Sequence, residues 1–224
     1  MANNLIRALS SMLAWSVPRG WRDTNPCVGL RKLKGGEGYA PWTWEEIVSF
    51  RATARRDIWH AAALALYSGQ RLSDVLSMRW NDIKGGLIAV VQQKTGKQLW
   101  IPAHEDLRLV LAEMPRTHVH ILTNSRGAAW TLDGFKTSWG DELDRPEMAA
   151  LREGRRVFHG LRKSAVVFLL EAGCTDAEVS AITGQSRRMV EHYSRQVSQK
   201  KLAAAAVLKW EAAGAPRTDN EQNL

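Results

Sequence analysis

Apolar residues recur along the chain at two spacings, one typical of helices and one typical of strands. Near the start, Leu5, Leu9 and Leu13 lie four apart, which predicts one amphipathic helix over residues 1–15. The apolar pattern and the helix-boundary residues predict further helices over residues 55–68, 104–114, 131–143, 159–172 and 199–213. We therefore expect a chain that is largely helical.

Helix-boundary residues set the limits of several predicted helices. Thr43 precedes two glutamates and is expected to begin a helix, because acidic side chains favour a helix N-terminus. Thr175-Asp176-Ala177-Glu178 has the pattern of a capping box, so a helix is predicted directly after it. Ser73 and Ser186 are expected to cap two more helices, and the second of these contains Tyr193.

Two short segments interrupt the helical spacing and have β character. Residues 87–92 and 98–101 flank the sequence Lys94-Thr95-Gly96-Lys97, in which Gly96 supplies the turn. This arrangement predicts a β-hairpin with Lys94 at its tip. The expected fold class is therefore mainly α, of the α+β type, with a small antiparallel β-sheet.

Composition and charge narrow the class of partner. The chain has 224 residues, is 45% hydrophobic and carries a formal net charge of +8 with a pI of about 9.8. A basic surplus of this size favours a polyanionic partner, nucleic acid before an anionic membrane, although a merely soluble cationic surface explains it too. Up to Gly36, six Lys or Arg stand against one Asp, so much of the surplus lies in this front segment.

Cysteine usage and hydropathy indicate a compartment. Cys27 and Cys174 lie far apart and form neither a metal-binding spacing nor a disulfide framework, so a reducing environment is expected. Apolar runs stay too short for a membrane span, and Arg7 interrupts the only apolar stretch near the start. We expect a cytoplasmic, DNA-associated protein.

Four places along the chain have residues suited to chemistry. They are Arg71 after a helix-ending glycine, Lys94 in the hairpin turn, the pair His159 and Arg162 at a helix start, and Tyr193. Each has an ordinary explanation by itself, because such residues are often solvated, turn-forming or capping groups. Their order and spacing along the chain are more specific evidence of a function than any one of them alone.

At these places the chain resembles the tyrosine recombinase (phage integrase) family. The resemblance covers roughly residues 41 to 210. The similar segments are Tyr67-Ser68-Gly69-Gln70-Arg71-Leu72-Ser73-Asp74-Val75-Leu76 and its continuation Met78-Arg79-Trp80-Asn81-Asp82-Ile83, Lys94-Thr95-Gly96-Lys97, His159-Gly160-Leu161-Arg162, Thr183-Gly184-Gln185-Ser186, and Met189-Val190-Glu191-His192-Tyr193. It implies a recombinase catalytic domain that acts on double-stranded DNA, in a homotetramer joined through the C-terminal helix.

The resemblance and the chemistry together suggest a role for each residue. Transesterification at a phosphodiester needs a nucleophile, an acid, a base and charge neutralisation. Tyr193 is the expected nucleophile, since Tyr39 falls in the Gly-rich linker and Tyr67 on an apolar helix. The remaining expected roles are phosphate binding by Arg71 and Arg162, proton transfer by His159 and Lys94, and support of Arg71 by Asp74.

The chain departs from the family pattern at two points. Gln185 stands where the family usually has His; it can donate a hydrogen bond to phosphate but cannot carry charge. The expected organisation is a remnant helix of a core-binding domain with a basic linker over residues 1–38, a catalytic domain over 39–213 and a disordered tail over 214–224.

Three functions stay open at this point. The first is a site-specific recombinase that works without ATP, metal or cofactor through a 3′-phosphotyrosyl intermediate. The second is a type IB topoisomerase-like enzyme that nicks and reseals one duplex with the same residues. The third is a DNA-binding protein without catalysis.

Overall fold

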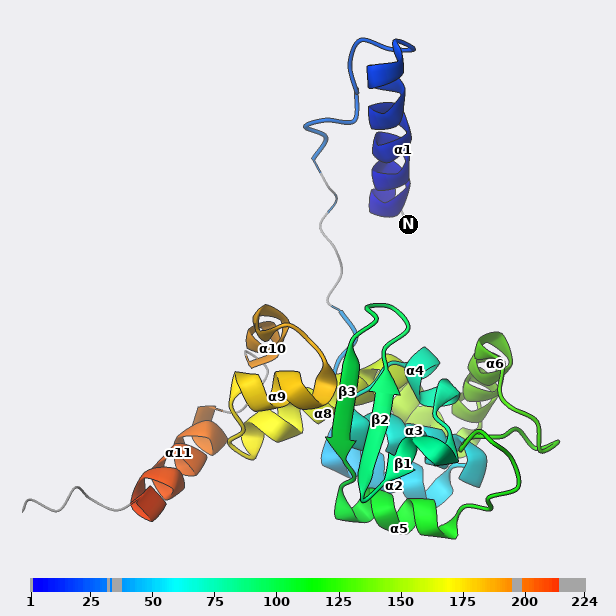
Figure 1. Cartoon of the computed structure of the whole chain (residues 1–224), viewed down its shortest axis with the longest axis vertical. Helices are drawn as coiled ribbons and strands as arrows, with labels where there is room; N and C mark the ends of the chain where they lie inside the picture. Colours follow the sequence, from blue (N-terminus) through cyan, green and yellow to red (C-terminus); the bar gives the residue numbers. More distant parts are fainter. Residues whose placement is uncertain (1, 32, 34–37, 195–198, 214–224) are drawn as a thin grey trace, which may run out of the picture. The chain divides into compact units, whose positions relative to one another are not determined.

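The computed structural model describes residues 2–31, 33, 38–194 and 199–213 (Figure 1). The chain divides into two units, Met1–Gly38 and Tyr39–Leu224. Helices are the main elements of both, and one small antiparallel sheet lies in the second, so the predicted fold class is confirmed. Within the described ranges, none of the helices combines the length and the apolar character that crossing a bilayer requires.

The first unit is built around α1 (Ala2–Ser16), which confirms the helix predicted there. A 3₁₀ turn, η1 (Val17–Arg19), follows it. The later part of the unit is held to α1 by Asn3, whose side chain donates to the backbone oxygen of Leu33 at 2.7 Å and accepts from its N–H at 2.9 Å. Polar side-chain contacts therefore keep this segment alongside the helix.

The second unit begins with two helices that pack into the core. α2 (Trp44–Thr53) starts at Thr43, where the predicted cap is confirmed as a capping box between Thr43 and Glu46. α3 (Arg56–Ser68) is buried along most of its length. Gly69 ends α3 with φ 63°, a conformation that favours glycine, and it turns the chain sharply.

α4 (Leu72–Ser77) begins earlier than predicted. Its N-cap is Arg71, in an extended conformation, so the expectation that Ser73 caps this helix was wrong. Asp74 thereby falls in the first turn, where its fully buried carboxylate accepts from the backbone N–H of Gln93 at 2.9 Å. The turn after Gly69 and this distant contact decide where the helix starts.

The sheet packs one face on the core. Its strands, in the order β1-β2-β3, are β1 (Ile83–Lys84), β2 (Leu87–Val91) and β3 (Gln98–Pro102). β2 and β3 form the predicted hairpin, in which Ile88 pairs with Ile101. β1 was not predicted, because two residues are too few to show an alternation. Ile88 and Val90 are buried while Leu87 and Val91 are exposed, so the apolar face covers the helices.

The remaining helices follow the predicted ones closely, apart from α7, which was not predicted. They are α5 (Glu105–Glu113), α6 (Leu132–Leu143), α7 (Ala149–Glu153), α8 (Phe158–Glu171), α9 (Asp176–Thr183), α10 (Arg187–Ser194) and α11 (Gln199–Ala213). Two 3₁₀ turns, η2 (Trp80–Asp82) and η3 (Pro146–Met148), complete the elements. Thr175 caps α9 through its hydroxyl, as expected, and Thr131 caps α6 in the same way.

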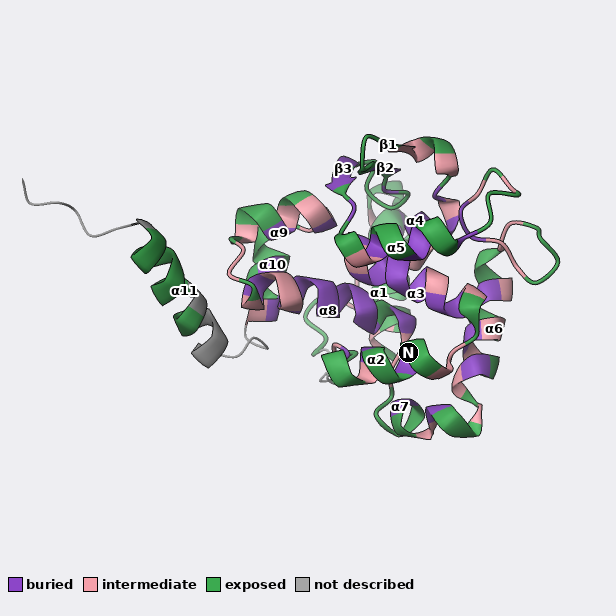
Figure 2. Cartoon of the chain, turned by 90° about the horizontal axis from the view of Figure 1, so that it is seen from below, coloured by how far each residue is buried: buried purple, intermediate pink, exposed green. Residues whose placement is uncertain are grey.

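Helix α8 is buried along most of its length (Figure 2). Its first turns pack on the main core, whose aromatic members are Trp42, Phe50, Trp59, Phe135, Trp139 and Phe158. Its later turns join a second, smaller cluster with α9 and α10, made of Val166, Val167, Leu170, Val179, Val190 and Tyr193. One helix therefore links His159 and Arg162 to the segment that carries Tyr193.

Candidate active site

The corner between α3 and α4 presents Arg71. Its Nη1 lies 3.8 Å from Oδ2 of the buried Asp74, so the arginine and the carboxylate form an ion pair within the corner. Since Asp74 also accepts from the hairpin backbone, the pair ties Arg71 to the β2–β3 turn. Gly69 allows a close approach at this corner, because a Cβ there would lie 2.8 Å from Cγ2 of Thr183.

Arg162 is held by two backbone carbonyls. Its Nη1 donates to the oxygen of Gly69 at 2.7 Å and its Nη2 to the oxygen of Thr183 at 3.0 Å. The side chain is 3% exposed, and burial, together with the nearby charge of Arg71, lowers its pKa to about 10. Arg162 is still cationic at neutral pH, and a guanidinium has more N–H groups than these two hydrogen bonds use.

His159 lies in the first turn of α8, surrounded by cations. Partial burial lowers its pKa below the usual 6.5, and the charges of Arg162, Lys163, Arg71 and Lys94 lower it further. The imidazole is therefore neutral at neutral pH and can accept a proton. Lys94, an exposed residue of the hairpin turn, makes the smallest of these electrostatic contributions.

Tyr193 lies near the end of α10 and is 7% exposed. Burial in the smaller apolar cluster raises the pKa of its phenol, and the charge of Arg162 opposes that rise. Nζ of Lys163 lies 5.4 Å from the centre of the tyrosine ring. The neutral phenol of Tyr193 is thus influenced by two cations, Arg162 and Lys163, and the charges of both also act on His159.

Gln185 follows the glycine that ends α9. Its backbone N–H donates to Oγ1 of Thr183 at 3.3 Å, and its side chain is partly exposed. Gly184 has φ 70°, and a Cβ there would lie 2.5 Å from Nε2 of Gln92. The close approach at Gly184 places Gln185 next to the carbonyl that holds Arg162.

Residues 39–42 lie against the start of α8, although Tyr39 was predicted to belong to the linker. Gly160 permits this, because a Cβ there would lie 2.8 Å from the backbone oxygen of Ala40. The ring of Tyr39 lies edge-on to His159 with centroids 6.4 Å apart, and its backbone oxygen accepts from Nζ of Lys163. Tyr39 and Lys163 were not among the predicted site residues.

A buried polar network behind these side chains was also missed by the sequence analysis. Its members are Gln70, Gln92 and Thr183, all fully buried. The sequence gives one signal for them: Gln70 directly precedes Arg71, and Gln92 lies two residues before Lys94. Polar residues are usually expected to face solvent, so only their burial in the structure shows that these residues form a network.

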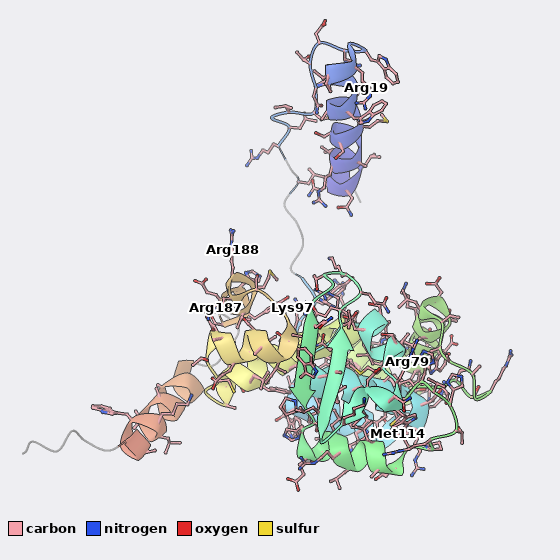
Figure 3. All side chains as sticks on the ribbon, viewed as in Figure 1. Arg19, Arg79, Lys97, Met114, Arg187 and Arg188 are labelled. Carbon is pink, nitrogen blue, oxygen red and sulfur yellow. The ribbon has the colours of Figure 1, made fainter. Side chains whose placement is uncertain are left out.

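Basic side chains are exposed around the site. Arg187 and Arg188 project from the first turn of α10, and Arg188 points away from the body of the unit (Figure 3). Lys97 lies in the turn of the hairpin, on the side of the unit to which Arg188 points in this view. A cationic surface next to buried arginines suits a phosphate-rich ligand.

Known proteins resemble this chain in sequence and in fold. Residues 43–200 match the model of the phage integrase family. The integrase of Enterobacteria phage 434 is 33% identical over 102 residues, which are 44% of this chain and 29% of that protein. This chain therefore matches less than a third of that relative's length.

Two solved structures share this fold. A lambda integrase dimer bound to a COC′ core site aligns with a TM-score of 0.69 and 22% identity, over 84% of this chain and 73% of that one. A lambda integrase tetramer bound to a Holliday junction aligns with a TM-score of 0.71 and 23% identity, over 86% and 58%. At such identities the likeness establishes the architecture.

Proposed function

The chain belongs to the phage integrase family of tyrosine recombinases, and we propose that it is a site-specific recombinase that cleaves and rejoins DNA through a 3′-phosphotyrosyl intermediate. One observation carries this proposal. Residues from three segments of the chain meet electrostatically at Arg162: the charge of Arg71, the neutral imidazole of His159 and the buried phenol of Tyr193 each interact with it. That combination suits attack on a phosphodiester.

The proposed reaction is a transesterification in which the number of phosphoester bonds is unchanged. The hydroxyl of Tyr193 attacks phosphorus, the bond from phosphorus to the 5′ oxygen breaks, and the tyrosine becomes joined to the 3′ phosphate. His159 accepts the phenol proton, and Lys94 donates a proton to the departing oxygen. The bond energy is retained, so this scheme needs no ATP, and its reverse rejoins the strand; in it, arginines rather than a metal neutralise the charge on the phosphate.

The protonation states of the free protein fit these roles. A phenol with a raised pKa is protonated at neutral pH, so Tyr193 needs a base. A histidine with a lowered pKa is unprotonated at the same pH and can act as that base. Burial therefore prepares the donor and the acceptor of the same proton.

The arginines supply charge at the phosphate in this scheme. Arg71 and Arg162 bind the non-bridging oxygens and stabilise the charge that develops in the transition state. The hydrogen bonds of Arg162 to Gly69 and Thr183 fix its orientation, and the ion pair with Asp74 supports Arg71. Gln185 donates a further hydrogen bond to the phosphate from the end of α9.

Trapping with nicked duplexes tests the proposal. The test uses duplexes selected for binding to the chain, each with a nick close to the cleavage site. Cleavage then frees a short fragment that carries the 5′ hydroxyl, and loss of this fragment prevents rejoining. The expected product is a covalent, protease-sensitive DNA adduct that Tyr193→Phe abolishes while DNA affinity stays nearly unchanged, because only one hydroxyl is lost. If the wild-type chain binds these duplexes without forming an adduct, it is a DNA-binding protein without catalysis.

Recombination of two duplexes, rather than resealing of one, is favoured by the C-terminal helix. The side chains of Leu208 and Trp210 on α11 are 65% and 73% exposed. The second unit also carries an apolar pocket of about 550 Å³, lined among others by Trp44, Leu66 and Phe168. An apolar helix and an apolar pocket are complementary between copies of the chain, which supports a homotetramer on double-stranded DNA.

Sedimentation separates this assembly from a topoisomerase-like enzyme. The protein is mixed with pairs of duplexes that each carry one site. A recombinase is expected to form a complex that holds two duplexes, whereas a topoisomerase-like enzyme remains one protomer on one duplex. The solved lambda integrase tetramer on a Holliday junction is a precedent within the same fold.

A further inference from the structure

Gln92 is a fully buried polar residue at the point where β2 runs into the hairpin turn. Burying a side-chain amide is unfavourable unless its donors and acceptors find partners. Each polar atom of this amide has partners within the unit. The arrangement of those partners, from three separate segments, shows what the residue joins.

The amide nitrogen faces the side of the site that holds the arginines. Nε2 donates to Oε1 of Gln70 at 2.7 Å and to the backbone oxygen of Thr183 at 3.0 Å. Gln70 directly precedes Arg71, and the oxygen of Thr183 is also the acceptor for Nη2 of Arg162. One amide group therefore contacts both the residue that precedes Arg71 and the carbonyl that holds Arg162.

The rest of Gln92 closes the turn that carries Lys94. Its Oε1 accepts from Oγ1 of Thr95 at 2.8 Å. Its backbone N–H donates to the oxygen of Lys97 at 2.9 Å, and its backbone oxygen accepts from the N–H of Gly96 at 2.8 Å. The turn is thus fastened to the same residue that contacts the arginine supports.

We infer that Gln92 is a positioning residue, which holds the Lys94 turn in register with the arginines so that the lysine reaches the departing 5′ oxygen. The inference rests on the proposed function. Gln92 itself lies behind the site and does not touch the reacting atoms. The amide of Gln92 both donates and accepts, whereas Glu accepts alone when ionised and Leu does neither.

A change of leaving group isolates this role from a general structural one. The full chain is given nicked duplexes in which the 5′ bridging atom at the cleavage site is either oxygen or sulfur. A thiol has a pKa of about 8.5, so sulfur leaves as thiolate without receiving a proton. Sulfur therefore removes the need for Lys94 but not for Tyr193, Arg71 or Arg162.

The variants Gln92→Leu and Gln92→Glu are expected to slow cleavage of the oxygen substrate by about tenfold to a hundredfold, the effect of a misplaced proton donor. On the sulfur substrate both are expected to stay within about threefold of wild type, since the remaining machinery is intact. The ratio of the two rates, measured on one preparation, does not depend on how much of the protein is folded.

Three further variants serve as controls. Lys94→Ala is expected to show the same recovery with sulfur, and Arg162→Lys is expected to be slow on both substrates. Gln98→Leu makes the same substitution at an exposed position of the hairpin and is expected to leave both rates unchanged. Lys94→Ala shows the pattern expected for loss of the proton donor, and Arg162→Lys shows the pattern expected for loss of phosphate binding. The Gln92 variants are compared with these two patterns.

Several results would overturn the inference. Equal slowing of the Gln92 variants on both substrates would mean that the residue supports the arginines or the fold rather than Lys94, and wild-type rates on both would mean that it positions nothing. If Lys94→Ala slowed cleavage of the oxygen and sulfur substrates equally, Lys94 would not be the proton donor that Gln92 is inferred to position. A wild-type chain that forms no adduct with either substrate would instead refute the proposed function.

Discussion

The arginine side and the tyrosine side of the candidate site are held by different kinds of contact. Arg162 is buried and bonded to two backbone carbonyls, with the amide of Gln92 braced against one of them. Tyr193 lies on α10, a helix whose buried residues are Val190 and Tyr193 alone. Beyond it, large side chains of α11 such as Trp210 are exposed.

This difference indicates which half of the site is organised before DNA binds. Hydrogen bonds to buried carbonyls fix a guanidinium in direction as well as in position, as electrostatic stabilisation of a transition state requires. Burial of one apolar side chain contributes roughly 1.5–3 kcal/mol, without directional preference. The half that is proposed to bind phosphate is therefore preorganised, whereas the tyrosine is held by fewer directional contacts, as expected if DNA and neighbouring copies complete its placement.

The largest expected effect comes from the preorganised half. Arg71→Lys and Arg162→Lys should each reduce adduct formation on the oxygen substrate by roughly a hundredfold or more, because a point charge cannot reproduce a planar, bidentate group. Single-turnover cleavage rates measure this. Arg152→Lys, an exposed position on α7, is the matched control. Near-normal rates in either site variant would mean that the arginine has a structural role only.

Gln185 lies on the same side of the site, but its side chain is free of the buried network. Gln185→Ala is expected to slow cleavage by about tenfold to a hundredfold, the range for one lost hydrogen bond to a charged oxygen. Gln185→His should be tolerated, since imidazole also donates a hydrogen bond. The same single-turnover assay applies, and an alanine variant as fast as wild type would put Gln185 outside the site.

The weakly held half is tested by removing its last helix. Deletion of residues 199–224 is expected to reduce recombination between two sites several-fold more than it reduces cleavage of one site, because α11 is proposed to dock on a neighbour. Both reactions are measured on the same preparation, so loss of folded protein affects them alike. Recombination that survives the deletion intact would show that α11 has no part in assembly.

The smallest expected effect concerns the charge around His159. An NMR titration of the free protein should give a pKa below 6.5 for this histidine. Removing a nearby cation favours the protonated imidazole, so Lys94→Ala should raise that pKa slightly. Lys97→Ala, in the same turn, should leave it unchanged. If the pKa of His159 were unaltered in Lys94→Ala, the charge of Lys94 would have no influence on this histidine.

Much of the fold followed from the sequence, while part of the site did not. The capping box at Thr175 and the hairpin turn at Gly96 are local patterns, and both elements formed as predicted. The cap assigned to Ser73 was wrong because α4 starts directly after the turn at Gly69, with Arg71 as its N-cap. Tyr39 was assigned to the linker because nothing near it in the sequence indicates its contact with His159.

The sequence by itself determined the helices, the hairpin and the order of the motif residues, since periodicity and capping depend on residues only a few positions apart. Only the tertiary structure decided which buried polar groups meet. Gln70 and Gln92 are 22 residues apart, and Trp42 and Ser164 are 122 apart. Such hydrogen bonds form only where apolar packing has already brought both segments out of water, and that packing is a property of the whole core rather than of any one segment.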